Sequence, residues 1–321
     1  MSLPGLVLTP LLLVLLAAAP PKPAPKAPSK PPEPAYPPLV QTLRAELIRN
    51  FETLKSKAEP APYFLSYQVT DDEAFTLSAA WGAVTSQNEG RRRTLDVSIR
   101  VGSRELDNYR VIDGDRPRFA AATPLPAEDH PLAIAQAAWR ETDRAWRAAA
   151  ARYLKVKTSL QVKPGAPPLP EFSIEEPASA AKPVPRPVWN PEEWAGRLRR
   201  LSAQVEPASG ILASEVALAV RRQVNTVVTS EGTAVEHGRT FARIQIVVRG
   251  KTYDGQDLVV SDNFDADDPA GLPKEDVVAA AVRNCSSQMK QLLRAPPADP
   301  FVGPAILSER AAGVFFHEIF G

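Results

Sequence analysis

The residues best suited to carry chemistry lie near the carboxyl end of the sequence, where His317 is followed directly by Glu318. The mostly apolar residues 311–316 precede the pair and predict a buried helix that ends in it. A neutral imidazole can bind zinc while an adjacent carboxylate takes a proton from metal-bound water, so the pair is the first half of a zinc-hydrolase signature. Zinc needs about three protein ligands and a water. The pair alone therefore indicates zinc chemistry without completing a site.

The other histidines and the single cysteine are weaker candidates. His130 precedes a predicted helix and is expected to cap it or to be solvated, and His237 is expected in a surface loop. Cys285 lies in a predicted helix, and one cysteine excludes both an internal disulfide and a Cys-based zinc knuckle. On the residues alone, only one possible metal ligand, His317, and one possible base, Glu318, stand out. The residues alone identify no substrate-binding position and no organic cofactor.

The charge balance argues against nucleic-acid binding. Lys and Arg number 38 against 37 Asp and Glu, and the formal net charge is +1, so the chain has no basic field for a phosphate backbone. The one notable basic cluster, residues 91–93, opens a predicted strand and is expected to be a solvated edge.

The segment from Gly303 to Gly321, GPAILSERAAGVFFHEIFG, resembles the part of TldD/PmbA-family metallopeptidases that leads into their HExxxH motif. The resemblance implies that His317 is the first zinc ligand and Glu318 the catalytic base. The motif's second histidine would follow Gly321, and the family's later cysteine ligand would lie further on; Cys285 precedes the motif and does not match it. The pair points to the TldD-like branch, since the PmbA-like partner generally lacks the motif. The resemblance also implies an enclosed chamber between two subunits, where unfolded peptides are gripped as added β-strands.

The first half of the folded body reads as helix, three strands, helix. Apolar residues at helical spacing predict a helix over 39–54, and Asp129 is expected to cap a second helix that reaches about 152. Trp139 and Trp146, seven residues apart in that helix, are expected in the core. Between the helices, strand-like runs at 63–70, 74–84 and 94–101 are separated by Asp71-Asp72 and by residues 88–90.

The second half repeats this order. Asn190 can cap a helix that begins at Pro191, strands are predicted at 211–220, 223–229 and 240–248, and a helix at 277–293 closes the unit. Short matches at an offset of about 145 residues suggest an internal duplication. The expected fold is α+β, with two similar helix/three-strand/helix lobes that have antiparallel sheets, followed by the first helix of a truncated catalytic domain.

The ends and linkers of these units follow from composition. Residues 1–19 form an apolar run typical of a signal peptide, with an uncleaved anchor as the alternative. Residues 20–38 include ten prolines and predict an extended spacer. The first lobe is predicted over 39–163, a proline-rich linker over 164–190, the second lobe over 191–295, and the start of the catalytic region over 296–321. Export to the periplasm or outside the cell is expected, with membrane contact only through an uncleaved leader.

Two functions remain open at this stage. The first is the amino-terminal part of an exported TldD-like zinc peptidase that hydrolyses unfolded peptides, either with a PmbA-like partner or as a homodimer. The 321 residues alone are expected to be inactive, because they lack the further zinc ligands. The alternative is a non-catalytic extracytoplasmic binding or assembly module.

Overall fold

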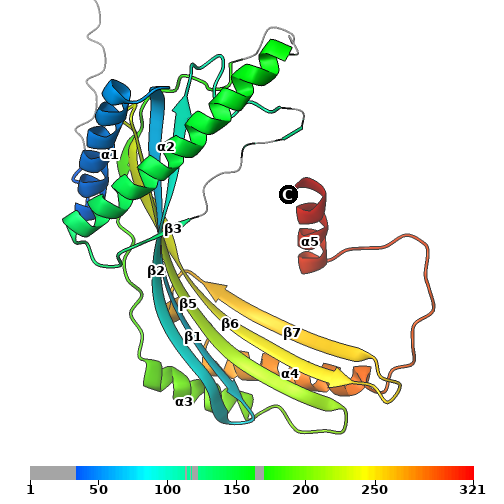
Figure 1. Ribbon diagram of the computed structural model, residues 1–321. Helices are drawn as coiled ribbons and strands as arrows, with labels where there is room; N and C mark the ends of the chain where they lie inside the picture. Colours follow the sequence, from blue (N-terminus) through cyan, green and yellow to red (C-terminus); the bar gives the residue numbers. More distant parts are fainter. Residues whose placement is uncertain (1–33, 113, 116, 118–121, 163–169) are drawn as a thin grey trace, which may run out of the picture. The chain divides into compact units, whose positions relative to one another are not determined.

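A computed structural model describes residues 34–112, 114, 115, 117, 122–162 and 170–321, and these residues build one curved sheet with helices packed on it (Figure 1). The predicted leader, 1–19, and most of the predicted spacer, 20–38, lie outside the described residues. No helix among the described residues has the length and apolar character needed to cross a membrane.

Helices and strands alternate along the described residues in two similar series. The helices are α1 (Pro38–Lys57), α2 (Pro131–Val162), α3 (Pro191–Ser202), α4 (Glu275–Leu292) and α5 (Glu309–Phe320), with a short 3-10 turn at Pro269–Gly271. The strands are β1 (Pro62–Ala80), β2 (Ala83–Val101), β3 (Thr123–Leu125), β4 (Ser179–Ala181), β5 (Ile211–Thr229), β6 (Ala234–Lys251) and β7 (Asp257–Ala266).

The sheet has a nearly symmetric strand order. It runs β3-β2-β1-β5-β6, and β7 pairs with β6, so each half contributes a long hairpin and a shorter third strand. The two hairpins meet at its centre, where β1 and β5 pair antiparallel from Ser66↔Thr229 to Ala79↔Val216. The only parallel pairing among the described strands is that of β4 with β6. The α+β class and the antiparallel pairing are confirmed, with both halves sharing a single sheet.

The strands are longer than the sequence predicts. Asp71 and Asp72 lie inside β1 instead of in a turn, because they face arginines on the neighbouring strands: Asp71 pairs in register with Arg93, and the Asp72 carboxylate binds Arg221 of β5. Residues 88–90 likewise lie within β2. Trp81 and Gly82 form the two-residue turn between β1 and β2. Both have a positive φ, which such a turn requires to match the twist of the strands. The predicted breaks at 221–222 and before 240 are also absent, and β7 was not predicted.

The predicted helices are present, with differences at their ends. Asn190 caps α3 by accepting hydrogen bonds from the backbone N–H groups of Glu192 and Glu193, as expected. At the start of α2 the predicted cap is wrong: the His130 Nδ1 accepts from the backbone N–H of Ala133, while Asp129 binds Arg93. Helix α2 also continues to Val162, ten residues beyond the predicted end.

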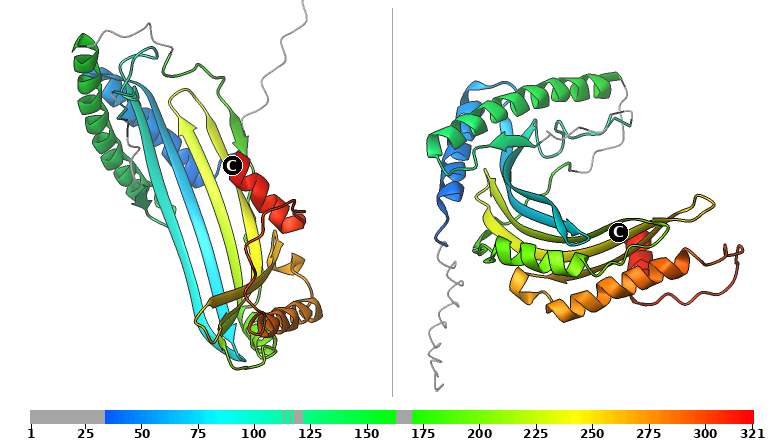
Figure 2. Two further views of the ribbon diagram at one scale, coloured as in Figure 1. Left: turned by 90° about the vertical axis from the view of Figure 1, so that its right-hand side faces the viewer. Right: turned by 90° about the horizontal axis from the view of Figure 1, so that it is seen from below.

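Four helices cover one face of the sheet, called here the helix-covered face. Helices α1 and α2 pack on one half of the strand length and α3 and α4 on the other (Figures 1 and 2). The first core includes the buried residues Val40, Leu43, Leu65, Tyr67, Leu95 and Ile134. The second core includes Leu77, Leu198, Leu218, Ile244, Val278 and Met289. Strand residues alternate in direction, so the opposite, largely polar face carries none of these helices and is called the open face.

The two tryptophans of α2 have different environments. Trp139 is 51% exposed, so its predicted place in the core is wrong. Trp146 is partly buried against the first core, and its Nε1–H donates to the carbonyl of Pro60 at 3.1 Å. A seven-residue spacing puts both rings on one side of the helix, beside its buried residues, and the contact with Pro60 helps to bury Trp146.

The described parts of both proline-rich segments pack against the body. Tyr36 is buried and donates its hydroxyl to the carbonyl of Ala234 at 3.0 Å. In the second segment, Phe172 packs on Phe64 with ring centroids 4.6 Å apart, and Trp189 packs on Phe75 at 4.5 Å. Tyr36 belongs to the first core and Trp189 packs against the second, although their neighbours' composition is typical of linkers.

Candidate functional site

The predicted metal ligand and base, His317 and Glu318, lie in the last turn of α5. The expectation of a buried helix is wrong: no residue of α5 is buried, and its apolar side chains pack chiefly on one another, with Phe316 stacked on Phe320 at 6.1 Å. Both His317 and Glu318 are exposed. They are consecutive in the helix, so their side chains leave it about 100° apart.

The described residues do not fit a zinc ion on their own. Nowhere among them do three or more His, Cys, Asp or Glu side chains gather as a metal ion requires. Zinc in proteins takes about three protein ligands. A zinc site that includes His317 would need ligands from outside the described residues.

An exposed ion pair from Arg310 links the start of α5 to an edge of the sheet. The Arg310 Nη2 lies 2.7 Å from the Asp262 carboxylate and 3.4 Å from the Asn263 carbonyl, both on β7. In the described sheet β7 pairs only with β6, which leaves the other edge of β7 without a partner strand. The His-Glu pair therefore belongs to a helix linked to an edge strand of the described sheet.

The remaining candidate residues are not near-neighbours in a common site. His130 caps α2, as expected, and His237 is exposed, but it lies within β6 opposite Asn225 and not in the predicted loop. Cys285 is buried in α4, where burial and then the nearby Asp262 carboxylate raise the pKa of its thiol. A buried thiol with a raised pKa is inert.

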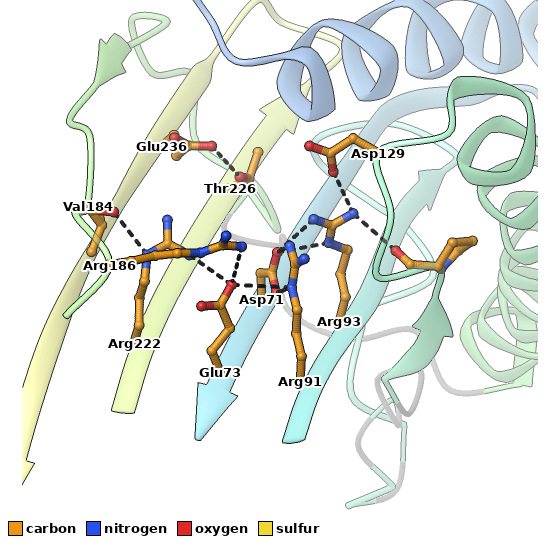
Figure 3. Close-up of polar contacts among 11 residues, drawn as sticks. Asp71, Glu73, Arg91, Arg93, Asp129, Val184, Arg186, Arg222, Thr226 and Glu236 are labelled. Atoms are coloured by element: carbon orange, nitrogen blue, oxygen red, sulfur yellow. Dashed lines mark hydrogen bonds and ion pairs between the residues drawn. The ribbon is translucent and has the colours of Figure 1, made fainter. Parts of the chain in front are cut away.

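A band of charged side chains crosses the helix-covered face between the two cores (Figure 3). We call it the polar band; on β1 and β2 it contains Asp71, Glu73, Arg91 and Arg93. Arg93 is 3% exposed, and its guanidinium lies 2.7 Å from Asp71 and 2.8 Å from Asp129. The predicted solvated edge at 91–93 is therefore wrong for Arg93, whereas Arg91 and Arg92 are exposed. Arg91 and Arg93 both lie in the interior of β2 and point to acids on β1.

Asp71 holds the most tightly paired carboxylate of the polar band. Arg91 binds it through two hydrogen bonds of 2.9 and 2.6 Å, and Arg93 binds it through two of 3.0 and 2.7 Å. Burial alone would raise the pKa of Asp71, but the hydrogen bonds from Arg91 and Arg93 and their positive charges hold it below its usual value. Asp71 is thus an ionised structural group, which joins β1 to β2.

The polar band continues onto the second hairpin. Glu73 forms ion pairs with Arg222 from β5 and with Arg186 from the segment before α3. Glu236 on β6 accepts a 3.4 Å hydrogen bond from Thr226 (Figure 3). Burial raises the pKa of Glu236, against the lowering effect of the Thr226 hydrogen bond. Charges from both halves of the chain therefore meet at the centre of the sheet.

The open face is a polar surface with its own depression. A cavity of about 440 Å³ there is lined by side chains of β1, β5 and β6, among them Asp72, Thr76, Arg221, Arg239, Phe241 and Gln245. Asp72 and Arg221 form a 2.6 Å ion pair across β1 and β5. Such a floor of side chains can hydrogen-bond to polar ligands, but no reactive group stands out in it.

Sequence reasoning missed the polar band, although a signal for it was present. Asp71 and Glu73 are two residues apart, as are Arg91 and Arg93, and the four positions mirror one another about Gly82. Opposite charges with a two-residue period on both sides of a hairpin turn predict facing ion pairs on one side of the sheet.

Comparisons with known proteins concern the fold. No family model matches the sequence, and no curated protein matches it either. Among solved structures, TldE from Thermococcus kodakarensis matches with 13% identity and a TM-score of 0.47 over 77% of this chain and 47% of that chain. A protein from Thermotoga maritima described as a "putative modulator of a DNA gyrase" matches with 10% identity and a TM-score of 0.46, over 79% of this chain and 49% of that one.

A third match is a "putative modulator of DNA gyrase" from Bacteroides thetaiotaomicron, with 7% identity and a TM-score of 0.45 over 75% of this chain and 49% of that chain. The chain spans about half the length of these structures. These structures are similar to the described part of the chain in fold alone.

Proposed function

We propose that this chain is the amino-terminal part of an exported, TldD-like zinc peptidase that acts on unfolded peptides. The observation that carries the proposal is the segment from Gly303 to Gly321, whose sequence leads into a His-Glu pair in the last turn of α5. In this proposal His317 is one zinc ligand and Glu318 the general base. Residues outside the 321 described by this sequence supply the other ligands.

The edge of the sheet offers a way to hold an extended peptide. Among the described residues the outer edge of β7 has no partner strand, and Arg310 of α5 is ion-paired to the same strand. A peptide added as a further strand would be held by backbone hydrogen bonds, which impose little sequence preference. This supports a substrate class of unfolded peptides and a site in which the peptide runs past α5.

The exposed apolar side of α5 supports a further part of the proposal, namely that other protein covers it. Val314, Phe315, Phe316, Ile319 and Phe320 are each 47–80% exposed, a cluster that is costly to leave in water. We take the cover to be the rest of the catalytic region together with a partner subunit, either PmbA-like or a second copy. Export rests on the apolar run at 1–19 alone.

One observation favours the alternative of a non-catalytic binding or assembly module. The described residues lack a group of side chains able to hold a metal ion, and the polar band and both cores form without one. Under this alternative α5 is simply a docking helix, and His317 and Glu318 are surface residues.

Hydrolysis by the complete protein separates the two functions. The protein as it is made in its source, purified with any partner subunit, should cleave an unfolded substrate such as reduced, alkylated casein. Glu318→Gln should lower the cleavage rate by at least about a hundredfold, as loss of a general base does. The matched control Glu309→Gln, at the other end of α5, should leave the rate unchanged. Equal activity of the Glu318→Gln and parent proteins, or no activity in the parent, would favour the binding module.

A further inference from the structure

A cavity that involves neither His317 nor Glu318 lies on the helix-covered face, between the two cores. Its volume is about 440 Å³. Its lining includes Glu73, Phe75, Arg91, Arg186, Trp189 and Arg222, which come from β1, β2, β5 and the segment that precedes α3. Figure 3 shows the charged members of this set converging on Glu73. The cavity thus combines a charged floor with an aromatic wall.

Several arginines converge on one carboxylate at the floor of this cavity. Three guanidinium groups lie near the Glu73 carboxylate: Arg186 at 3.0 Å, Arg91 at 3.4 Å and Arg222 at 3.4 Å. Arg91 already has a closer partner, because two hydrogen bonds of 2.9 and 2.6 Å join it to Asp71. Arg186 and Arg222 therefore share one carboxylate. Glu89, which is exposed, is the second acid in the lining.

The two shared guanidiniums also keep unused donors. Arg222 donates from its Nε to the carbonyl of Val184 and from its Nη1 to Glu73. Arg186 donates from its Nη2 to Glu73. Among the described residues, the Nη2 of Arg222 and the Nη1 of Arg186 have no hydrogen-bond acceptor. Planar guanidinium groups with free N–H pairs match the two oxygens of a carboxylate.

The aromatic wall is held in place by the core and by the backbone. Trp189 is partly buried and packs on Phe75, with ring centroids 4.5 Å apart. The segment that carries Trp189 and Arg186 is tied to the sheet where the Lys182 N–H donates to the Glu236 carbonyl at 2.9 Å. The cavity is therefore shaped before any ligand arrives, which lowers the cost of binding.

We propose that this cavity binds a carboxylate that is attached to an aromatic or apolar group. The carboxylate lies between Arg186 and Arg222, and the attached group packs on Trp189. A carboxylate offers two coplanar oxygens to these free N–H groups, whereas a phosphate dianion would be repelled more strongly by Glu73 and by Glu89, which also lines the cavity.

Titration calorimetry with defined probes tests this proposal on the full chain. The first probe is 3-phenylpropionate, and its neutral analogue 3-phenylpropionamide is the control ligand. We expect the acid to bind saturably and the amide not to bind. Arg186→Gln and Arg222→Gln should each weaken binding of the acid by about tenfold or more, since each removes a charge-assisted hydrogen bond. Arg147→Gln, an exposed arginine on α2, should leave the affinity unchanged.

Arg186 is the decisive position, because its side chain is 67% exposed and its loss does not threaten folding. Unchanged melting of Arg186→Gln together with weakened binding would establish the site. Binding of the peptide Ala-Ala-Phe as tightly as the free acid would identify peptide carboxyl termini as the source of the ligand, and binding of the free acid alone would identify a small organic acid. No binding of either acid, equal binding of the amide, tighter binding of inorganic phosphate, or unchanged affinity in Arg186→Gln would overturn the proposal.

Discussion

Removing the Asp71 carboxylate should destabilise the fold strongly, because two arginines of the polar band would lose their closest partner. Loss of one member of a buried ion pair costs about 3–5 kcal/mol. Here Arg93 would keep Asp129 at 2.8 Å and Arg91 would keep Glu73 at 3.4 Å, which places Asp71→Ala at the lower end, about 3 kcal/mol. With a urea m-value of about 3 kcal/mol/M for a chain of this size, the unfolding midpoint should fall by about 1 M.

Urea unfolding followed by far-ultraviolet circular dichroism measures this midpoint, with Asp143→Ala as the matched control. Asp143 also pairs with an arginine, Arg147 at 2.9 Å, but both side chains are exposed. Exposed pairs contribute little to stability, so the control should unfold close to the parent. Equal midpoints for Asp71→Ala and Asp143→Ala, or an Asp71→Ala midpoint within about 0.2 M of the parent, would refute the assigned role of the polar band.

The same pair of proteins should show a defined pH dependence. The pKa of Asp71 is lowered in the folded protein, so its stabilising effect is complete above the unfolded pKa of 3.8. The effect is lost as pH falls from that value through the folded pKa. The difference in midpoint between the parent and Asp71→Ala should therefore be constant from pH 5 to 7 and shrink below about pH 4. A difference that grows on acidification would contradict the assignment.

Two further substitutions, each with a control, test the interior of β6 and the start of α3. Gly238→Ala should destabilise the protein by about 1–3 kcal/mol, because a Cβ at this position would lie 2.1 Å from the carbonyl oxygen of Gln223. The control Gly90→Ala has open space around its Cβ, so it should be neutral or slightly stabilising in the same urea titration. Asn190→Ala should cost about 1 kcal/mol in thermal unfolding through loss of the α3 cap, while Ser308→Ala, whose side chain makes no cap hydrogen bond, should leave the melting temperature unchanged.

Local patterns in the sequence predicted most elements but not their lengths. The cap at Asn190 and the helical spacing at 39–54 depend on neighbouring residues, so α3 and α1 were predictable. The sequence predicts a turn at Asp71-Asp72 because acidic residues are rare in strands. The arginines that stabilise these residues within β1 come from β2 and β5. The polar band was not predicted for the same reason, since its ion pairs join residues that are far apart in the sequence.

The candidate site was only partly predictable, for a related reason. The identity and helical placement of His317 and Glu318 follow from the sequence, and the structure confirms that they lie in one helix. Burial of that helix was predicted from its apolar composition alone, but burial needs a partner surface, and none of the described elements supplies one. The attachment of α5 to β7 depends on Arg310 and Asp262, 48 residues apart.

The central claim is that His317 binds catalytic zinc, and the zinc content of the complete protein tests it most directly. The protein is purified from its source without chelators, with any partner subunit, and its zinc is measured by mass spectrometry beside His317→Ala and Glu318→Gln. The account predicts stoichiometric zinc in the parent and in Glu318→Gln, and its loss in His317→Ala. Zinc retained in His317→Ala, or absent from the parent, would contradict it.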